Sequence, residues 1–279
     1  MKKLKYLLGA VAISATALAT AQIQMPAPSP LATVSQKFGL GEINIEYSRP
    51  VANDRKIFGE VVPFDKLWRT GANGSTQITF SDVVTIQGQH IRPGTYAIYT
   101  IPHAGAWEIF LYSDLKLGGN VNNYDKKNEV ARFKTETTEL RDKVESFTIN
   151  LDNIKPTSAN LVFAWENTRA SIEITTEIDS RVMKSIDESM ESKKPAYFQA
   201  ATYYYNNDKD LKKALVWAEN AVKENPKAYY MILLKAKIEY KLGDKEAGNK
   251  SAMQTIEAAK AASNDDYVRM AEELMKANK

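Results

Sequence analysis

The chain has 279 residues, of which 44% are hydrophobic, and it carries 37 basic against 34 acidic side chains. Three lysines and no acids lie in residues 1–21, so the rest of the chain is balanced at 34 of each. This balance gives no electrostatic reason to expect nucleic acid as a partner. The sequence contains no cysteine, which excludes disulfide bonds and lipid attachment through a thiol.

Residues 1–21 have the features of a cleavable export signal. An apolar stretch over residues 7–19 follows a positive start and ends in Ala19-Thr20-Ala21, the small residues that signal peptidase requires. The positive start consists of Lys2, Lys3 and Lys5. A membrane anchor is the alternative, but a spanning helix needs about 20 apolar residues and this stretch is shorter. We therefore expect an exported protein, periplasmic or secreted, with no stable membrane insertion after cleavage.

Residues 22–178 are predicted to form a β-rich domain, because apolar side chains alternate with polar ones along several short segments. The alternating apolar sets are Ile43/Ile45/Tyr47, Thr76/Ile78/Phe80, Trp107/Ile109/Leu111, Phe147/Ile149/Leu151, Leu161/Phe163/Trp165 and Ala170/Ile172/Ile174. Gln87-Gly88 is typical of a tight hairpin turn. About eight to ten short strands without intervening helices favour an antiparallel β-sandwich or barrel-like fold.

Residues 179–279 are predicted to be all-α, because the apolar period becomes helical and Ala, Lys, Glu and Leu dominate. Six helices are expected, near 179–192, 196–206, 210–224, 227–242, 245–261 and 264–277. Their pairing into helical hairpins resembles the tetratricopeptide (TPR) repeat.

The TPR-like pattern rests on small residues at the positions where paired helices approach closely. The matching positions of the first repeat are Tyr205, Ala214, Ala221 and Pro226. In the second repeat, one 34-residue step later, Ala236 occupies the position where a small residue lets the paired helices pack closely. The second repeat departs from the pattern, because it has Gly248 where alanine is usual and lacks the closing proline. A plain helical bundle is the alternative.

Several short motifs follow one another between residues 29 and 176. They are Ser29-Pro30, Tyr47-Ser48-Arg49-Pro50, Arg55-Lys56-Ile57-Phe58-Gly59, Val62-Pro63, Trp68-Arg69-Thr70-Gly71-Ala72-Asn73, Pro93-Gly94-Thr95-Tyr96 and Trp165-Glu166-Asn167. On these motifs the first half resembles the family known as domain of unknown function 2911, found mostly in exported proteins of the Bacteroidetes group. The resemblance implies a β-rich fold, export and frequent attachment to helical repeats. It implies no established activity.

No reaction centre is recognisable in the sequence. The two histidines, His90 and His103, form no metal-binding spacing, so neither a metal nor a cofactor is expected. There is no Gly-x-Ser-x-Gly elbow, and the glycine pairs do not open βαβ units that would bind phosphate. Catalytic residues are therefore unknown, and a non-enzymatic role is favoured.

The long connection around residues 49–73 is the candidate ligand-binding segment. Its three arginines are forks that bind carboxylates or phosphates, and aromatic and polar side chains accompany them. The candidate ligand-binding residues are Arg49, Arg55, Asp65, Trp68, Arg69, Asn73 and Glu166. The alternative is structural bracing, in which the same arginines and rings hold a long loop together.

Two functions remain open at this point. The leading hypothesis is an exported envelope protein that acts as an interaction or scaffolding module, with a peptide or protein partner bound in the concave face of the helical stack. The alternative is small-molecule or carbohydrate binding, or hydrolysis, by the β-rich domain through residues 49–73.

Overall fold

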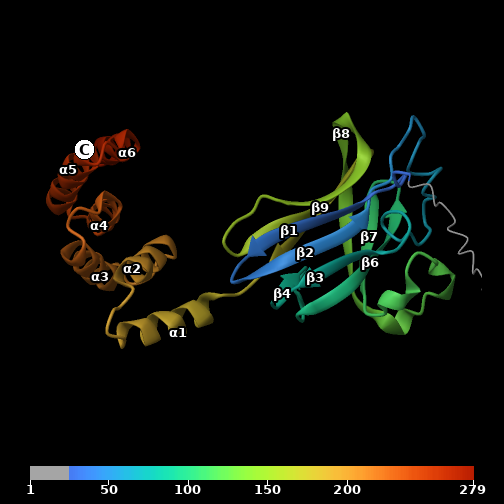
Figure 1. Ribbon diagram of the computed structural model, residues 1–279, viewed down its shortest axis with the longest axis horizontal. Helices are drawn as coiled ribbons and strands as arrows, with labels where there is room; N and C mark the ends of the chain where they lie inside the picture. The colour runs from blue at the N-terminus through green and yellow to red at the C-terminus, as the bar shows by residue number, and fades with distance from the viewer. Residues whose placement is uncertain (1–24) are drawn as a thin grey trace, which may run out of the picture. The chain divides into compact units, whose positions relative to one another are not determined.

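A computed structural model describes residues 25–279, which divide into two compact units after Thr176 (Figure 1). We call them the β-unit and the helical unit. The predicted export signal lies outside the described residues. Within residues 25–279, no helix combines the length and the apolar character needed to cross a membrane.

The described part of the β-unit is a nine-stranded antiparallel sheet with the strand order β1-β2-β3-β6-β7-β8-β9-β4-β5. The strands are β1 (Leu31–Phe38), β2 (Gly41–Ser48), β3 (Thr76–Phe80), β4 (Val84–Ile86), β5 (Gln89–Ile91), β6 (Gly94–His103), β7 (Ala106–Tyr112), β8 (Glu129–Asp152) and β9 (Ser158–Thr175). The predicted β-rich fold is confirmed. The expectation of uniformly short strands is wrong, because β8 has 24 residues and β9 has 18.

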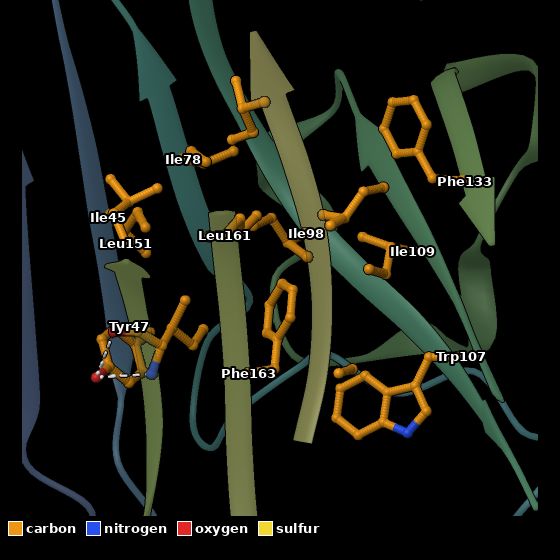
Figure 2. Packing of buried hydrophobic residues seen from close by; sticks show 14 of the residues in the cluster. Ile45, Tyr47, Ile78, Ile98, Trp107, Ile109, Phe133, Leu151, Leu161 and Phe163 are labelled. Carbon is orange, nitrogen blue, oxygen red and sulfur yellow. Dashed lines mark hydrogen bonds between the residues drawn. The ribbon is translucent and has the colours of Figure 1, made fainter. Parts of the chain in front are cut away.

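The length of β8 allows the sheet to fold over on itself. Its first part pairs with β7 up to Glu136, and from Thr137 onward it pairs with β9, with register breaks between Glu139 and Thr148. The Tyr47 hydroxyl of β2 donates to the Ile149 carbonyl of β8 at 3.2 Å, so these strands face each other across the core. Figure 2 shows side chains of β2 and of β8 and β9 pointing into the same interior.

The core of the β-unit consists of the side chains that the alternation predicts. All six alternating sets are buried, from Ile43 in β2 to Ile174 in β9. The hairpin at Gln87-Gly88 is also confirmed, since both residues have positive φ, at 45° and 77°. The side chains of Gln87 and Gln89 donate to carbonyls of β8 at 2.6 and 3.0 Å, which ties the last strands of the sheet back to its middle.

Two irregular segments complete the β-unit. The loop of residues 49–75 contributes Ala52, Ile57, Phe58 and Val62 to the main core. Residues 113–128, which we call the strap, contain the short turns η1 (Leu115–Leu117), η2 (Val121–Asn123) and η3 (Lys126–Asn128). The strap packs on the opposite side of β6 and β7 from the main core, against Tyr99, Phe110 and Tyr112.

The helical unit contains α1 (Asp179–Met190), α2 (Tyr197–Asn206), α3 (Leu211–Glu224), α4 (Tyr229–Lys241), α5 (Lys245–Ala261) and α6 (Asp265–Ala277). All six predicted helices are present, with each end within two residues of its expected position. Asp210, Asp244 and Asn264 cap α3, α5 and α6, because their side chains accept hydrogen bonds from first-turn N–H groups.

The helices pack as successive hairpins around α4, which contacts α3 and α5 and also both α2 and α6. Ala214, Ala221 and Ala236 are buried where helices approach, as the repeat pattern requires. At Gly248, an added Cβ would lie 2.7 to 2.9 Å from ring atoms of Tyr240. The absence of a side chain there lets α5 approach α4. The assignment as a TPR-like stack stays a prediction.

Candidate functional site

The three candidate arginines bond to different parts of the β-unit. Arg49 donates to the Phe147 carbonyl at 3.0 Å and to the Thr148 hydroxyl at 2.9 Å. Arg55 donates within its own loop, to the carbonyls of Ala52 and Val51, at 2.9 and 2.7 Å. These contacts use the guanidinium donors to anchor the loop on β8 and to close its first turn.

Arg69 lies where the loop meets the strap. It donates to the Gly119 carbonyl at 3.1 Å, while its Nε is buried without a hydrogen-bond partner among the described residues. A Cβ at Gly119 would collide with the carbonyl oxygen of Asn73, so glycine is needed for this close approach. The structure therefore brings Arg69 and Asn73 together at Gly119 but places Arg49 and Arg55 elsewhere.

Trp68 belongs to a cluster of aromatic rings. Its ring stacks on Trp165 with centroids 6.0 Å apart, and it meets Phe147 and Trp107 edge-on at 5.2 and 6.0 Å. The indole N–H donates to the Gly71 carbonyl, and the backbone pairs with Thr100 of β6. Phe58 packs against the same tryptophans. These rings form core rather than an open face for a sugar.

Two further candidates, Glu166 inside β9 and Asn73 in the loop, have unusual backbone geometry. Glu166 and Asn73 have φ values of 53° and 59°, in the left-handed region. Glu166 accepts a hydrogen bond from the backbone N–H of Ile57 at 3.0 Å. Asn73 donates to the Ser48 hydroxyl at 3.2 Å and to the Ser29 carbonyl at 3.3 Å. Both side chains connect the loop to strands that are distant in sequence.

Asp65 begins a chain of charged groups that sequence reasoning missed. Its carboxylate contacts His103 Nδ1 at 2.5 Å, and His103 Nε2 lies 3.5 Å from Glu108. Arg132 joins Glu108 at 3.0 Å to Glu129 at 2.8 Å, and its guanidinium covers the Phe110 ring. His103 follows a proline and precedes an Ala-Gly turn, so its sequence context alone suggested an ordinary surface residue.

The last member of this series of charged side chains, Glu129, is bonded to the strap, because the Tyr124 hydroxyl donates to Glu129 at 3.1 Å. Burial and the nearby Glu129 carboxylate raise the pKa of Tyr124 strongly, so it stays protonated. Burial alone would raise the pKa of Glu129, but hydrogen bonds from Arg132 and Tyr124 hold it below its ordinary value. This series of charged side chains therefore joins the loop, the sheet and the strap. We call it the clamp; its members are Asp65, His103, Glu108, Arg132 and Glu129.

The clamp has no geometry suited to catalysis. A histidine base needs one ring nitrogen open to substrate, whereas His103 Nδ1 faces Asp65 and Nε2 is buried against Glu108. Among residues 25–279, no group of three or more His, Cys, Asp or Glu side chains is placed to hold a metal ion.

A small polar cavity of about 290 Å³ lies beside the Asn73 turn. Its lining comes from β1, β2, β3, the turn at residues 74–75 and the strap, and includes Leu31, Glu46, Ser48, Ser75, Gln77 and Leu115. Ser48 is the hydroxyl held by Asn73. Of the seven predicted ligand-binding residues, Asn73 bonds to a residue of this cavity's lining, Ser48. Arg69 bonds to Gly119, the neighbour of the lining residue Gly118.

The helical unit carries a row of aromatic rings across three helices. Phe198 of α2 meets Tyr230 at 5.2 Å, Tyr230 meets Tyr229 at 5.8 Å, and Tyr229 meets Tyr267 of α6 at 4.7 Å. Asn264, the cap of α6, donates to the Tyr229 hydroxyl at 3.1 Å. We call Phe198, Tyr229, Tyr230 and Tyr267 the aromatic row. Tyr230 is 39% exposed, so the row reaches solvent.

A larger cavity, of about 580 Å³, lies among α3, α4 and α5. Alanines 258, 261 and 262 form part of its lining together with Gln254 and Glu257, and no aromatic ring lines it. Its lining therefore lacks the aromatic contacts that the aromatic row provides.

Comparison with known proteins places the first half in a family. A family model described as protein of unknown function (DUF2911) matches residues 29–174. Neither the curated proteins nor the solved structures yielded a match.

Proposed function

The chain belongs to the DUF2911 family, and we propose that it is an exported envelope protein whose helical unit binds an extended segment of a peptide or protein partner. The aromatic row carries this proposal. The β-unit is then the folded body that presents the helical unit, and the protein acts as an interaction module without catalysis.

The contacts within the row support binding. Four rings from α2, α4 and α6 follow one another at separations of 4.7 to 5.8 Å, at the first turns of alternate helices. Tyrosine rings supply large contact area with few rotatable bonds, and a tyrosine hydroxyl at the surface can bond to polar groups of a partner. An extended chain that crosses three helices would therefore find apolar anchors at successive positions.

Export is the second part of the proposal. It draws on the positive start, the apolar stretch and the Ala19-Thr20-Ala21 site of the sequence. Amino-terminal sequencing of the chain recovered from the envelope fraction would test it. A new amino terminus at Gln22 is expected, and recovery of uncleaved chain from the cytoplasm would contradict export.

The binding proposal is tested by site-specific photo-crosslinking in the producing cell. A photoreactive phenylalanine analogue at position 230 is expected to give a discrete adduct whose partner is identified by mass spectrometry. The same analogue replaces Met253 of α5 as the control, because Met253 is 56% exposed and lies outside the row. Tyr230→Ala should then weaken binding of the identified partner by roughly 30-fold, about 2 kcal/mol, as expected for an aromatic anchor.

Two results would contradict the proposal. One is an equal adduct pattern at positions 230 and 253, which would mean that contact at the row is non-specific. The other is a partner whose affinity is unchanged both by Tyr230→Ala and by deletion of residues 195–279.

A second candidate function is favoured by one observation. The cavity beside Asn73 gives the β-unit a place for a small molecule, in keeping with ligand or carbohydrate binding next to the 49–73 loop, although the lining comes from the residues on either side of that loop and from the strap. Hydrolysis by this unit lacks comparable support, since the clamp around His103 leaves no ring nitrogen open to a substrate.

A further inference from the structure

We propose that the cavity beside Asn73 is a binding site for a small hydroxylated amine, a compound that carries one ammonium group and neighbouring hydroxyl groups. The inference does not depend on the aromatic row or on peptide binding. It locates the second candidate function at a defined set of side chains and assigns it a chemical class of ligand.

One wall of the cavity carries a pair of polar side chains on adjacent strands, of which Glu46 is exposed to solvent and Gln77 is half-buried. Glu46 of β2 and Gln77 of β3 are register partners, so their side chains lie on the same face of the sheet. Neither side chain forms a hydrogen bond or an ion pair with another described residue. A free carboxylate beside a free amide offers acceptors for an ammonium group and both donor and acceptor positions for hydroxyls.

The rim adds two serine hydroxyls. The Ser75 oxygen is buried close to the side chain of Tyr99, and Ser48 is oriented by the amide of Asn73. A ligand hydroxyl could bond to either serine, because a serine hydroxyl both donates and accepts. These two hydroxyls favour a polar occupant over an apolar one.

The charge of the lining favours a positively charged ligand. Glu46 is the one ionisable carboxylate among the lining side chains, and neither Lys nor Arg lines the cavity. An anionic ligand would meet repulsion there, whereas a cation would form a charge-assisted hydrogen bond. Leu31 and Leu115 provide apolar contact for the carbon skeleton.

Size and rigidity fit the same class. A volume of about 290 Å³ equals roughly ten water volumes, which accommodates a compound about as large as a monosaccharide. The rim is fixed before any ligand arrives, because Asn73 bonds to two segments and Gly119 packs against its carbonyl. Preorganisation of this kind lowers the entropic cost of binding.

Calorimetry on the mature chain with three matched probes tests the proposal. Glucosamine supplies the ammonium and hydroxyl groups, glucose lacks the charge, and glucuronate reverses it. At slightly acidic pH, glucosamine should bind at least about tenfold more tightly than glucose, and glucuronate more weakly than either. E46Q should reduce glucosamine binding by about tenfold, and S75A by a smaller factor.

The controls separate this site from the rest of the molecule. E139Q removes an exposed carboxylate of β8 far along the strand register from the cavity and should leave binding unchanged. Tyr230→Ala should also leave it unchanged, so failure here and failure of the peptide-binding proposal are distinguishable. The inference is overturned if glucosamine does not bind, if the three probes bind equally, or if E46Q binds glucosamine as the wild type does.

Discussion

The loop of residues 49–73 and the aromatic row of the helical unit are both rich in rings, and they use them in opposite ways. In the loop, Phe58 and Trp68 pack against Trp107 and Trp165 inside the main core. In the helical unit, the rings contact one another at the surface, and Tyr230 remains 39% exposed. The conspicuous run of aromatic and basic residues is therefore packed into the fold of the β-unit, whereas the rings of the helical unit lie at the surface, where we propose that a partner binds.

The largest expected effect comes from removing a ring from the loop. Phe58→Ala should destabilise the β-unit by about 3–5 kcal/mol, because it opens a cavity among three tryptophans. The helical unit should keep its own stability, since the two units have separate cores. Denaturant unfolding followed by tryptophan fluorescence reports mainly on the β-unit, and helical circular dichroism reports on the other.

The matched control for this change lies six residues further along the same loop. Phe64 is at the surface and rests mainly on Gly59, so Phe64→Ala should cost less than about 1 kcal/mol. Equal losses for the two phenylalanines would contradict the assignment of the loop as core and would return it to consideration as an open ligand-binding segment.

The buried face of the β-unit was predictable from the sequence, but its pairing was not. Alternation at Ile43, Ile45 and Tyr47 identifies an inward face wherever the strand lies, because successive side chains point to opposite sides. It does not tell which strand lies opposite, and Tyr47 bonds to Ile149, 102 residues away. The polar first half of β8 was missed as a strand, because its outward and edge positions weaken the apolar alternation.

The same limit explains what was found and missed at the candidate site. The motif that contains Arg69 and Asn73 marks the turn that lies beside the cavity, but the lining of the cavity includes Glu46 and Gln77, which come from other strands. The contact between Asp65 and His103 likewise depends on the loop running beside β6. By contrast, the helices were predictable almost to the residue, since their capping and period are local.

A smaller effect is expected in the helical unit, at the position where the repeat pattern usually has alanine. Gly248→Ala should gain roughly 1 kcal/mol of helix propensity but lose about 1–3 kcal/mol through the clash with Tyr240. The net expectation is a modest destabilisation, measured by thermal unfolding of the helical signal. In a Tyr240→Leu background the clash is relieved, and the same change should become stabilising.

Gly74→Ala provides the control for this glycine, because a Cβ there would meet no atom within 4 Å. It should change stability by less than about 0.5 kcal/mol. If Gly248→Ala is stabilising with Tyr240 present, then α4 and α5 do not depend on the close approach, and a looser helical bundle would describe the unit better than a TPR-like stack.

The smallest expected effect is on stability at low pH, where one carboxylate of each unit can be compared. Hydrogen bonds from Arg132 and Tyr124 outweigh burial and lower the pKa of Glu129 below 4.5. A carboxyl group whose pKa is lower in the folded state stabilises the fold above its unfolded pKa, and this stabilisation is lost as pH falls through the folded pKa. E129Q should therefore cost less than about 1 kcal/mol at neutral pH, and the difference from the wild type should shrink as pH falls below 4.5 and disappear once pH is below the folded-state pKa of Glu129.

Asp179 of α1 is the corresponding group of the helical unit. Hydrogen bonds from Lys209 and then Tyr203 lower its pKa, but it lies at the surface, where solvent and salt screen the interaction. D179N should therefore change the acid dependence of stability of the helical unit, followed by circular dichroism, less than E129Q changes that of the β-unit, followed by tryptophan fluorescence. Added salt should weaken the effect of D179N before that of E129Q. Equal salt sensitivity of the two variants would mean that the strap leaves Glu129 as open to water as Asp179, and the clamp would then not hold the strap on the sheet.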